Sequence, residues 1–412
     1  MKKLIFPHVI LILLSLLLFS CESTVVNTSN PNYDKVYRVV DSIRQSLQTS
    51  SGKTIHSLNL LINTPSEEIF VSSVPAGSTP ITKNTYFRFA SNTKNMTAAA
   101  ILNMQEDGWL SIYDNIIDMI PGSALSYVPD SPSWDFPYKN QITIEQLLQH
   151  SAGVYDLAND SVPGTGGMSY VDYVESLDPN HQFMVGEFAN QLRVNNLSSF
   201  PPGTNHSYSN TGFAILSEII ARVYTVRKAT AKVYSDYLYD YLFGFSSPVP
   251  LPVTLPYLAF DQYLASPFVS GTEYLQNGGT KTFTNCNMSA NVGEGNGYGT
   301  MSNLNIYIRS LMTGVNVLTS ASLNLMKTDI SPGSTNYALG CALIPNLGYG
   351  HTGSTHGYIS AMFYDPLTGV SVICMIPVWD FSNGMTSYTN VNTAMFMACY
   401  SARSALGYPG LP

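Results

Sequence analysis

Strand-like segments occur near both ends of this sequence, and helical segments fill its middle. The strand segments are short, rich in β-branched and aromatic residues, and bounded by turn residues. They are His56–Ile62, Glu68–Ser73, Tyr337–Ile344, Gly357–Tyr364 and Gly369–Pro377. The pattern predicts an α+β fold in which one antiparallel sheet is built from both chain ends and flanked by helices. An all-helical subdomain is expected as an insertion over about residues 110–280.

The predicted helices carry apolar residues at a spacing of three to four positions. Thr143 is a candidate N-cap for one of them. The segments are Asp34–Gln48, the stretch from Ser91 to the stop signal at Asp107-Gly108, Ile142–Leu148, Thr211–Tyr224, Tyr234–Phe245, Met301–Met312 and Asn392–Leu406.

Charge and cysteine content exclude several function classes. Only 11% of the 412 residues are charged, against roughly 25% in an average globular protein, and the net charge is −8. An acidic chain without a cluster of lysines and arginines argues against a nucleic-acid partner. No cysteine or histidine spacing is typical of a metal site, so we expect neither metal nor cofactor. Four cysteines are expected to be buried free thiols, although an oxidising compartment would permit disulfides: Cys286, Cys341, Cys374 and Cys399.

The N-terminal residues resemble a bacterial export signal. Residues 1–20 combine two lysines with a run rich in leucine and isoleucine, as in a secretory signal peptide. The sequence Leu18-Phe19-Ser20-Cys21 resembles a lipoprotein box, in which Cys21 is lipidated and becomes the first mature residue. We therefore expect a tether over residues 21–32, a folded domain over 33–412, and a lipid-anchored protein of the cell envelope, facing the periplasm or the exterior. The alternative is a plain secretory leader with an incidental Cys21.

A serine and a lysine stand one helical turn apart where an aromatic-rich segment, Tyr86–Ala90, meets a helix. Ser91 and Lys94 are three residues apart, so their side chains can lie on one helical face. A serine hydroxyl needs a base to become a good nucleophile. A lysine in a poorly solvated helix can have a lowered pKa and act as that base or in a proton relay. The alternative is a serine N-cap beside an exposed lysine.

Two further short segments contain residues that could take part in catalysis or in substrate binding. Tyr208-Ser209-Asn210 follows a Pro-Pro-Gly turn, and a tyrosine beside an ammonium group loses its proton more easily. Asn210 offers a carbonyl and an amide for a substrate backbone. The second segment, Gly350–Gly357, lies just before a predicted strand, and its glycines would let a substrate approach the backbone closely. The alternatives are a loop tyrosine beside a helix cap and a glycine-rich strand entry.

Together the three segments resemble the motifs of the serine β-lactamase and penicillin-binding superfamily, which are Ser-x-x-Lys, Ser-Asp-Asn and Lys-Thr-Gly. Here Tyr208-Ser209-Asn210 stands in place of Ser-Asp-Asn, and His351-Thr352-Gly353 stands in place of Lys-Thr-Gly. Tyr-x-Asn resembles class C β-lactamases and the related D,D-carboxypeptidases, D-aminopeptidases and esterases. His-Thr-Gly is more similar to the D,D-carboxypeptidase and D-peptidase side. The resemblance covers most of the chain from Asp34 to Leu406.

The resemblance implies a catalytic set. Ser91 would attack a carbonyl and become acylated, and Lys94 and Tyr208 would share the removal and return of the proton. Asn210 would hold the substrate amide, and water would release the acyl group.

The resemblance also implies an opposite wall and an oxyanion hole. His351, Thr352 and Gly353 would line the wall, while the backbone N–H groups of Ser354 and Ser91 would stabilise the oxyanion. A histidine in place of the usual lysine can change its charge near neutral pH. We therefore expect activity or substrate preference to change across about pH 6 to 7.

Other features are expected to be structural. Gly293–Gly299 resembles a phosphate-binding loop but lacks the lysine and hydroxyl residue that should follow, so it is expected to be a turn before a helix. His150 is expected to be structural at a helix end, and His206 and His356 are not assigned a catalytic role.

The function that the sequence favours is a secreted serine hydrolase, most similar to a D,D-carboxypeptidase or D-peptidase. An esterase or a β-lactamase of the same superfamily is the alternative, with a small peptide, ester or β-lactam as substrate. A non-hydrolytic envelope protein that binds β-lactams or muropeptides is the alternative of another class. The oligomeric state stays open.

Overall fold

The folded domain begins slightly earlier than the sequence predicted. The structure is a computed structural model that describes residues 30–412. The predicted signal peptide, Cys21 and most of the predicted tether lie outside the described residues. Helix α1 (Pro31–Ser51) is capped by the Asn30 side chain, which accepts the N–H of Asn32. The side chain of Asn32 donates to Glu67 over 2.6 Å, so the last residues of the predicted tether belong to the fold.

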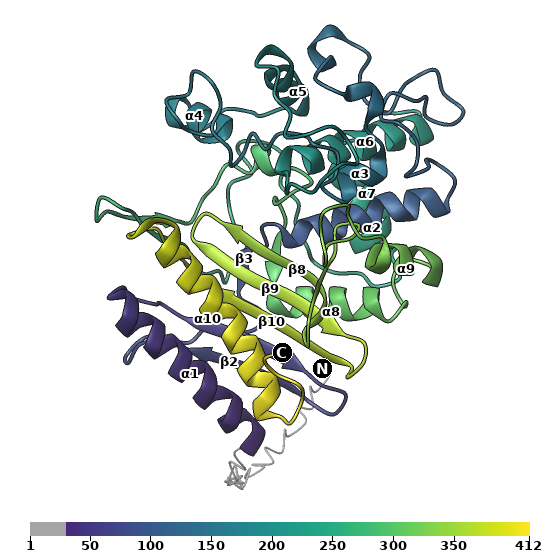
Figure 1. The fold of residues 1–412 in the computed structure, drawn as a ribbon. Coiled ribbons are helices and arrows are strands. Elements are labelled where there is room, and N and C mark those ends of the chain that lie inside the picture. The colour runs from purple at the N-terminus through teal and green to yellow at the C-terminus, as the bar shows by residue number, and fades with distance from the viewer. Residues whose placement is uncertain (1–29) are drawn as a thin grey trace, which may run out of the picture.

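The remaining elements follow in the order in which Figure 1 labels them. The helices are α2 (Asn92–Glu106), α3 (Ile144–Leu148), α4 (Tyr170–Leu177), α5 (Val185–Val194), α6 (Asn210–Lys228), α7 (Tyr234–Leu238), α8 (Met301–Met312), α9 (Ser320–Thr328) and α10 (Gly384–Ala405). The strands are β1 (Leu58–Asn63), β2 (Glu68–Ser73), β3 (Tyr86–Arg88), β4 (Gly271–Tyr274), β5 (Thr280–Phe283), β6 (Tyr298–Thr300), β7 (Ala342–Ile344), β8 (Gly348–Thr355), β9 (Tyr358–Asp365), β10 (Val370–Ile376) and β11 (Val378–Asp380).

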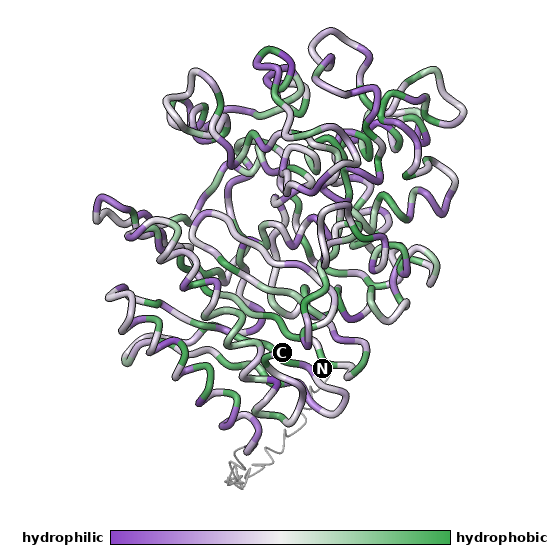
Figure 2. Tube along the Cα trace, viewed as in Figure 1, coloured by the Kyte–Doolittle hydropathy of each residue, from purple (hydrophilic) through white to green (hydrophobic). Residues whose placement is uncertain are grey.

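One antiparallel sheet joins the two ends of the chain, as the sequence predicted. Its strand order is β2-β1-β10-β9-β8-β7, and β1 pairs with β10 in a register that places Leu61 opposite Ile373. Helices α1 and α10 cover one face, while α2 and α8 contact the other (Figure 1). Because both faces are covered, every residue of β9 and β10 is buried. Figure 2 shows the hydrophobic residues along these central strands. The predicted α+β class is confirmed.

Strand β8 is the main element that the sequence analysis missed. Of the predicted strand Tyr337–Ile344, only Ala342–Ile344 forms a named strand, whereas Gly348–Thr355 pairs along its length with β9. Glycine is disfavoured in strands, so the glycine-rich segment gave no strand signal. The glycines serve close packing, since a Cβ atom at Gly350 would overlap the carbonyl oxygen of Met362 in β9.

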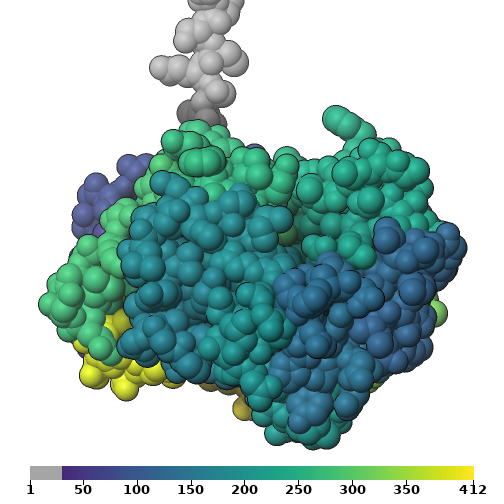
Figure 3. Space-filling view, turned by 90° about the horizontal axis from the view of Figure 1, so that it is seen from above, coloured from purple at the N-terminus to yellow at the C-terminus, as the bar shows by residue number. Residues whose placement is uncertain are grey.

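The middle of the chain forms a helical layer over one end of the sheet. Helices α3 to α7 belong to it, and in Figure 3 its blue to teal-green residues make up most of the face seen from above. The predicted helical insertion is not purely helical, because β4 lies within residues 110–280 and pairs with β5 and β11 in a small separate sheet. The predicted helix Tyr234–Phe245 is α7 followed by a π-helical turn, Tyr239–Phe243.

Two general features concern the described residues as a whole. Cys286, Cys341, Cys374 and Cys399 are buried and carry free thiols, as expected. Between residues 30 and 412, no helix combines the length and the apolar character that crossing a membrane requires.

Candidate active site

Helix α2 places Ser91 and Lys94 side by side in the centre of the molecule. Ser91 is the N-cap residue, and Lys94 lies one turn later with 0% of its surface exposed. Ala90, directly before the serine, has a φ of +50°, in the left-handed region that side chains other than glycine rarely adopt. Such strain persists only where the surrounding structure holds it, and it is common at functional sites. The expected pairing of Ser91 and Lys94 on one helical face is therefore present, and the exposed-lysine alternative is wrong.

The Lys94 ammonium group is enclosed by oxygen atoms from its own helical turn and from two distant segments. Its Nζ atom lies 3.1 Å from Ser91 Oγ and 2.6 Å from Asn210 Oδ1. It also lies 2.9 Å from both the backbone oxygen and the Oε2 atom of Glu294. The Asn210 carbonyl oxygen is thus occupied by Lys94, which leaves the amide N–H groups of that side chain for a substrate.

Lys94 is held in its charged form. Burial alone would lower its pKa, but attraction to Glu294 and Tyr208 outweighs the desolvation, and the pKa is raised above the usual lysine value. The hypothesis of a lysine with a lowered pKa that acts as a free base is therefore wrong. The ammonium group instead provides a fixed positive charge beside the serine hydroxyl.

Tyr208 lies against this charge. The distance from Lys94 Nζ to the centre of the Tyr208 ring is 4.8 Å. Burial raises the Tyr208 pKa above its usual value, while the charge of Lys94 and polar contacts with Ser91 and Lys94 oppose the rise without cancelling it. The expected effect of the ammonium group is present, yet burial exceeds it, so the resting side chain is a neutral phenol.

His150 holds the Tyr208 segment in place. Its backbone oxygen accepts the N–H of Ser207 over 3.0 Å, and its Nδ1 atom accepts the N–H of Ser209 over 3.1 Å. Its ring lies 4.2 Å from the Tyr208 ring, centre to centre. Burial, followed by the charge of Lys94, depresses the His150 pKa well below its usual value, which keeps Nδ1 free to accept. The expectation of a structural histidine agrees with these contacts.

Glu294 is the site residue that the sequence analysis missed. It lies in the Gly293–Gly299 segment, and its side chain is held by Asn291 Nδ2, which donates to Oε1 over 2.5 Å. The segment packs on the start of α2, because the Gly297 N–H donates to Thr93 Oγ1 over 3.1 Å. A Cβ atom at Gly297 would lie only 2.9 Å from that hydroxyl oxygen. The glycines therefore allow close packing against α2, and no sequence spacing marked Glu294 as the partner of a lysine 200 positions away.

His351 is buried in strand β8 and is held as one neutral tautomer. Its Nδ1 atom lies 2.5 Å from the backbone oxygen of Thr352, which only accepts, so Nδ1 carries the proton. Its Nε2 atom, 3.0 Å from the Tyr337 hydroxyl group, then accepts a hydrogen bond. Burial, with a smaller contribution from Lys94, lowers the His351 pKa to about 3. The expected change of charge across pH 6 to 7 is therefore wrong for this residue.

The rest of β8 brings its backbone close to the serine. A Cβ atom at Gly353 would overlap the backbone oxygen of Phe89 and lie 2.8 Å from Asn92 Nδ2. Only a glycine at position 353 lets β8 pack this closely against Phe89 and Asn92. The sequence analysis had instead expected the glycines to make room for a substrate. The Ser354 hydroxyl group accepts from Tyr388 of α10 over 2.7 Å, so its side chain faces away and only its backbone is available for an oxyanion. Thr352 is half-buried on the same strand face as Ser354.

We expect the His351 ring to stay neutral from about pH 8 to about pH 5, since its pKa lies near 3. Long-range ¹H–¹⁵N NMR of the imidazole nitrogens should show a constant Nδ1–H pattern over this range. The signal is assigned by its loss in a His351→Gln variant, and a His206→Gln variant should leave it unchanged. An inflection between pH 6 and 7 would contradict the buried neutral tautomer. Because the unfolded chain binds this proton near pH 6.5 and the folded chain near pH 3, the contribution of His351 to stability falls as the pH drops between these values.

Known proteins match this chain both in sequence and in fold. Residues 52–384 match the family model described as Beta-lactamase. Penicillin-binding protein 4* of Bacillus subtilis is 28% identical over 166 residues, which cover 40% of this chain and 30% of that protein. The probable hydrolase clz13 of Cochliobolus lunatus is 34% identical over 114 residues, or 27% of this chain and 16% of the relative. The chain thus spans less than a third of the length of these two relatives.

Solved structures extend the likeness over nearly the whole domain. The D-amino acid amidase of Ochrobactrum anthropi has a TM-score of 0.68 at 17% identity, covering 91% of this chain and 99% of that one. A D-stereospecific amidohydrolase from Streptomyces has a TM-score of 0.64 at 19% identity, covering 87% and 98%. These likenesses concern the fold, while the family model covers most of the sequence that carries the site. The chain belongs to the β-lactamase family, and it shares its fold with the amidase and amidohydrolase structures.

Proposed function

We propose that this protein hydrolyses the amide bond of short peptides or amides that contain a D-amino acid, through an acyl-enzyme on Ser91. The observation that carries the proposal is the buried Lys94 ammonium group, 3.1 Å from Ser91 Oγ and beside the Tyr208 ring. A binding protein has no need of a charged residue enclosed next to a serine hydroxyl. The names of the amidase and amidohydrolase structures with the same fold support a D-amino-acid substrate class.

In the first half of the proposed reaction, Ser91 Oγ attacks the substrate carbonyl while its proton passes to Tyr208. The neutral Tyr208 first releases its own proton to solvent water, and the Lys94 ammonium group stabilises the phenolate that results. The negative charge on the carbonyl oxygen is stabilised by the backbone N–H groups of Ser91 and Ser354. The C–N bond then breaks, and Tyr208 gives the proton to the leaving amine.

In the second half, water attacks the acyl group on Ser91. Tyr208, again a phenolate, takes a proton from the water, and the C–O bond to Ser91 breaks. Tyr208 passes this proton to Ser91 Oγ and is left as a phenolate, which takes up a proton from solvent water to restore the resting phenol. Asn210 amide N–H groups orient the substrate backbone, because its carbonyl oxygen is bonded to Lys94. Gly353 and the neutral His351 form the opposite wall. Thr352 contributes to this wall through its backbone, because its side chain lies on the same strand face as that of Ser354.

Replacement of Ser91 by alanine should abolish every covalent reaction of the protein. Wild type and Ser91→Ala are incubated with penicillin, a D-Ala-D-Ala peptide, D-phenylalanine amide and a p-nitrophenyl ester, and intact masses and products are measured. We expect Ser91-dependent hydrolysis of the D-peptide or the D-amide, and an exposed serine variant, Ser176→Ala, should match wild type.

Each other outcome identifies an alternative. A lasting penicillin adduct indicates a carboxypeptidase-like site, and rapid penicillin turnover indicates a β-lactamase. Ester hydrolysis alone indicates an esterase. Absence of any Ser91-dependent reaction would sink the proposal in favour of a β-lactam or muropeptide-binding protein.

Replacement of Glu294 by glutamine should impair both activity and stability. The change keeps the side-chain size but removes the counter-charge of a lysine with 0% exposure. We expect kcat/KM to fall by about 100-fold, since proton transfer contributes of this order. The free energy of unfolding should fall by about 3 kcal/mol, the usual cost of leaving a buried charge unpaired. Steady-state kinetics and denaturant unfolding measure the two effects.

The matched control is Glu187→Gln. Glu187 also contacts a basic side chain, with its Oε2 atom 2.9 Å from His181 Nε2, but it is partly exposed and does not contact the site. This variant should keep wild-type kinetics. Unchanged kinetics in Glu294→Gln as well would show that the carboxylate does not support Lys94.

We also propose that the protein is exported and attached to the cell envelope through a lipid on Cys21. The support is the lipoprotein-box resemblance in the sequence. A Cys21→Ser variant should lose incorporation of labelled palmitate and move from the membrane fraction to the soluble fraction. Palmitate labelling that persists in this variant would refute the anchor.

A further inference from the structure

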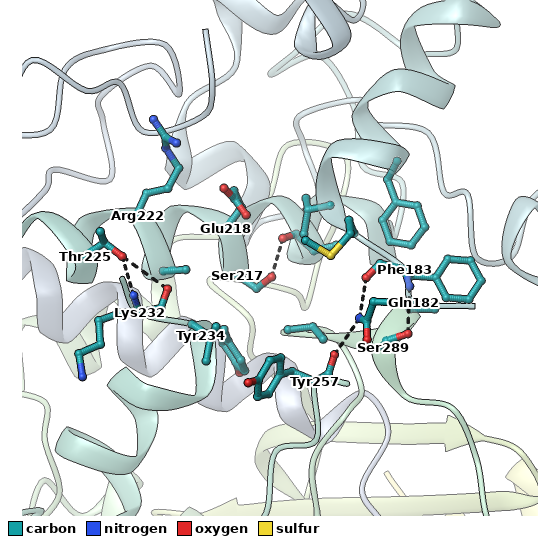
Figure 4. Close-up of a pocket in the computed structure, with 18 of the residues that line it drawn as sticks. Gln182, Phe183, Ser217, Glu218, Arg222, Thr225, Lys232, Tyr234, Tyr257 and Ser289 are labelled. Carbon is teal, nitrogen blue, oxygen red and sulfur yellow. Dashed lines mark hydrogen bonds between the residues drawn. The ribbon is translucent and has the colours of Figure 1, made fainter. Parts of the chain in front are cut away.

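A cavity lies along helix α6, the helix that begins with Asn210 of the candidate active site. It has a volume of about 390 Å³, within the range of small-molecule sites, and Ser91, Lys94, Tyr208 and His351 do not line it. One wall is a stripe of α6 that includes Ala214, Ser217 and Ala221, spaced at helical intervals (Figure 4).

The two ends of this cavity differ in chemistry. Figure 4 shows Arg222, Thr225 and Lys232 at one end and Phe183, Gln182 and Ser289 at the other, with Glu218 and Tyr257 between them. The walls between and around the second group are mainly apolar. An occupant that matches both ends needs an apolar body and a single polar head.

The polar end carries excess positive charge. Arg222 donates from Nε and Nη2 to the backbone oxygen of Ser126 over 3.1 and 2.9 Å, and this acceptor has no charge to offset the guanidinium group. Lys232 lies 5.6 Å from the ring centre of Tyr224, and among residues 30–412 neither cation forms an ion pair. The nearby acid is Glu218, whose pKa is raised by burial, although the charge of Arg222 opposes the rise. Because two cations and only one carboxyl group lie near this end, a ligand with an anionic head group is favoured here.

The cavity wall also carries the turn that holds Lys94. Ala290 and Val292 line the cavity, and Glu294 follows two residues after Val292. A Cβ atom at Gly293 would lie 2.6 Å from Cβ of the lining residue Ser217.

A second contact leads from the cavity to the same turn. The hydroxyl group of Tyr234, another lining residue, bonds to Thr97 Oγ1 over 2.7 Å. That oxygen donates to the backbone oxygen of Gly293 over 2.6 Å. A molecule in the cavity would therefore pack against Ser217, which contacts Gly293 directly, and against Tyr234, which reaches Gly293 through Thr97.

We propose that this cavity is a second ligand site for an amphiphilic monoanion, such as a medium-chain carboxylate, and that its occupancy alters hydrolysis at Ser91 through the Gly293–Glu294 turn. The regulatory half of this proposal, that occupancy of the cavity alters hydrolysis, rests on the proposed function. The other half, that the ligand binds, does not. The two halves are therefore tested by separate measurements.

Binding is measured by calorimetry on the Ser91→Ala protein with decanoate below its micellar concentration. We expect saturable binding at one site, at least about tenfold tighter for decanoate than for 1-decanol or decylammonium. An Ala221→Phe variant fills the cavity and should lose at least about tenfold in affinity. The control Ala321→Phe, on the exposed face of α9, should bind as the parent does.

A second variant covers the case in which Ala221→Phe does not fold. Lys232→Gln leaves the cavity open and should remove most of the preference for decanoate over decanol. Absence of saturable binding, equal affinity for the three probes, or unchanged binding in both cavity variants would overturn the site.

Coupling is measured on the wild-type enzyme with the substrate found to be hydrolysed. Saturating decanoate should change kcat at least about twofold, and this change should be absent in Lys232→Gln at the same concentration. Unchanged kcat with confirmed binding would overturn the regulatory half. An enzyme that hydrolyses none of the substrates would refute the proposed function and leave the binding result intact.

Discussion

A lysine ammonium group with no exposed surface is the constraint on which the rest of the site depends. Removing such a charge from water costs several kcal/mol unless a counter-charge and hydrogen bonds replace the lost hydration. Here the replacement comes from Asn210 and Glu294, which are 116 and 200 residues away in sequence. Three segments must therefore meet at one point for the fold to tolerate Lys94. The same requirement explains why the start of α2, the start of α6 and the Gly293–Gly299 turn are so closely packed.

The antiparallel sheet provides the rigid support for this meeting point. Strand β8 approaches the Phe89 carbonyl group so closely that only glycine fits at position 353. On the other side, Ala90 adopts a left-handed conformation directly before Ser91. Donors and charges held by such packing need little reorganisation when charge develops on a substrate, which is the usual source of a large rate enhancement.

The neutral histidines give the site an unusual electrostatic character. His150 and His351 both lie near Lys94, and burial keeps both rings uncharged. The positive charge beside the serine is therefore concentrated on one ammonium group, which its carboxylate partner balances. A histidine at position 351 thus contributes shape and a hydrogen bond from Tyr337, whereas a lysine there would add a second buried cation.

The sequence alone determined the fold class and the ordered set of site motifs. Strand β2 was predicted with its observed ends, and Thr143 caps α3 as expected, because both depend on local periodicity and turn chemistry. The pairing of Ser91 with Lys94 also follows from local helix geometry. Only the tertiary structure decided that Glu294 holds Lys94 and that β8 is a strand. It also decided that attraction to Glu294 and Tyr208 raises the Lys94 pKa, whereas burial lowers the His351 pKa. These properties depend on which groups lie next to one another in three dimensions. The spacing of residues along the chain does not encode those contacts.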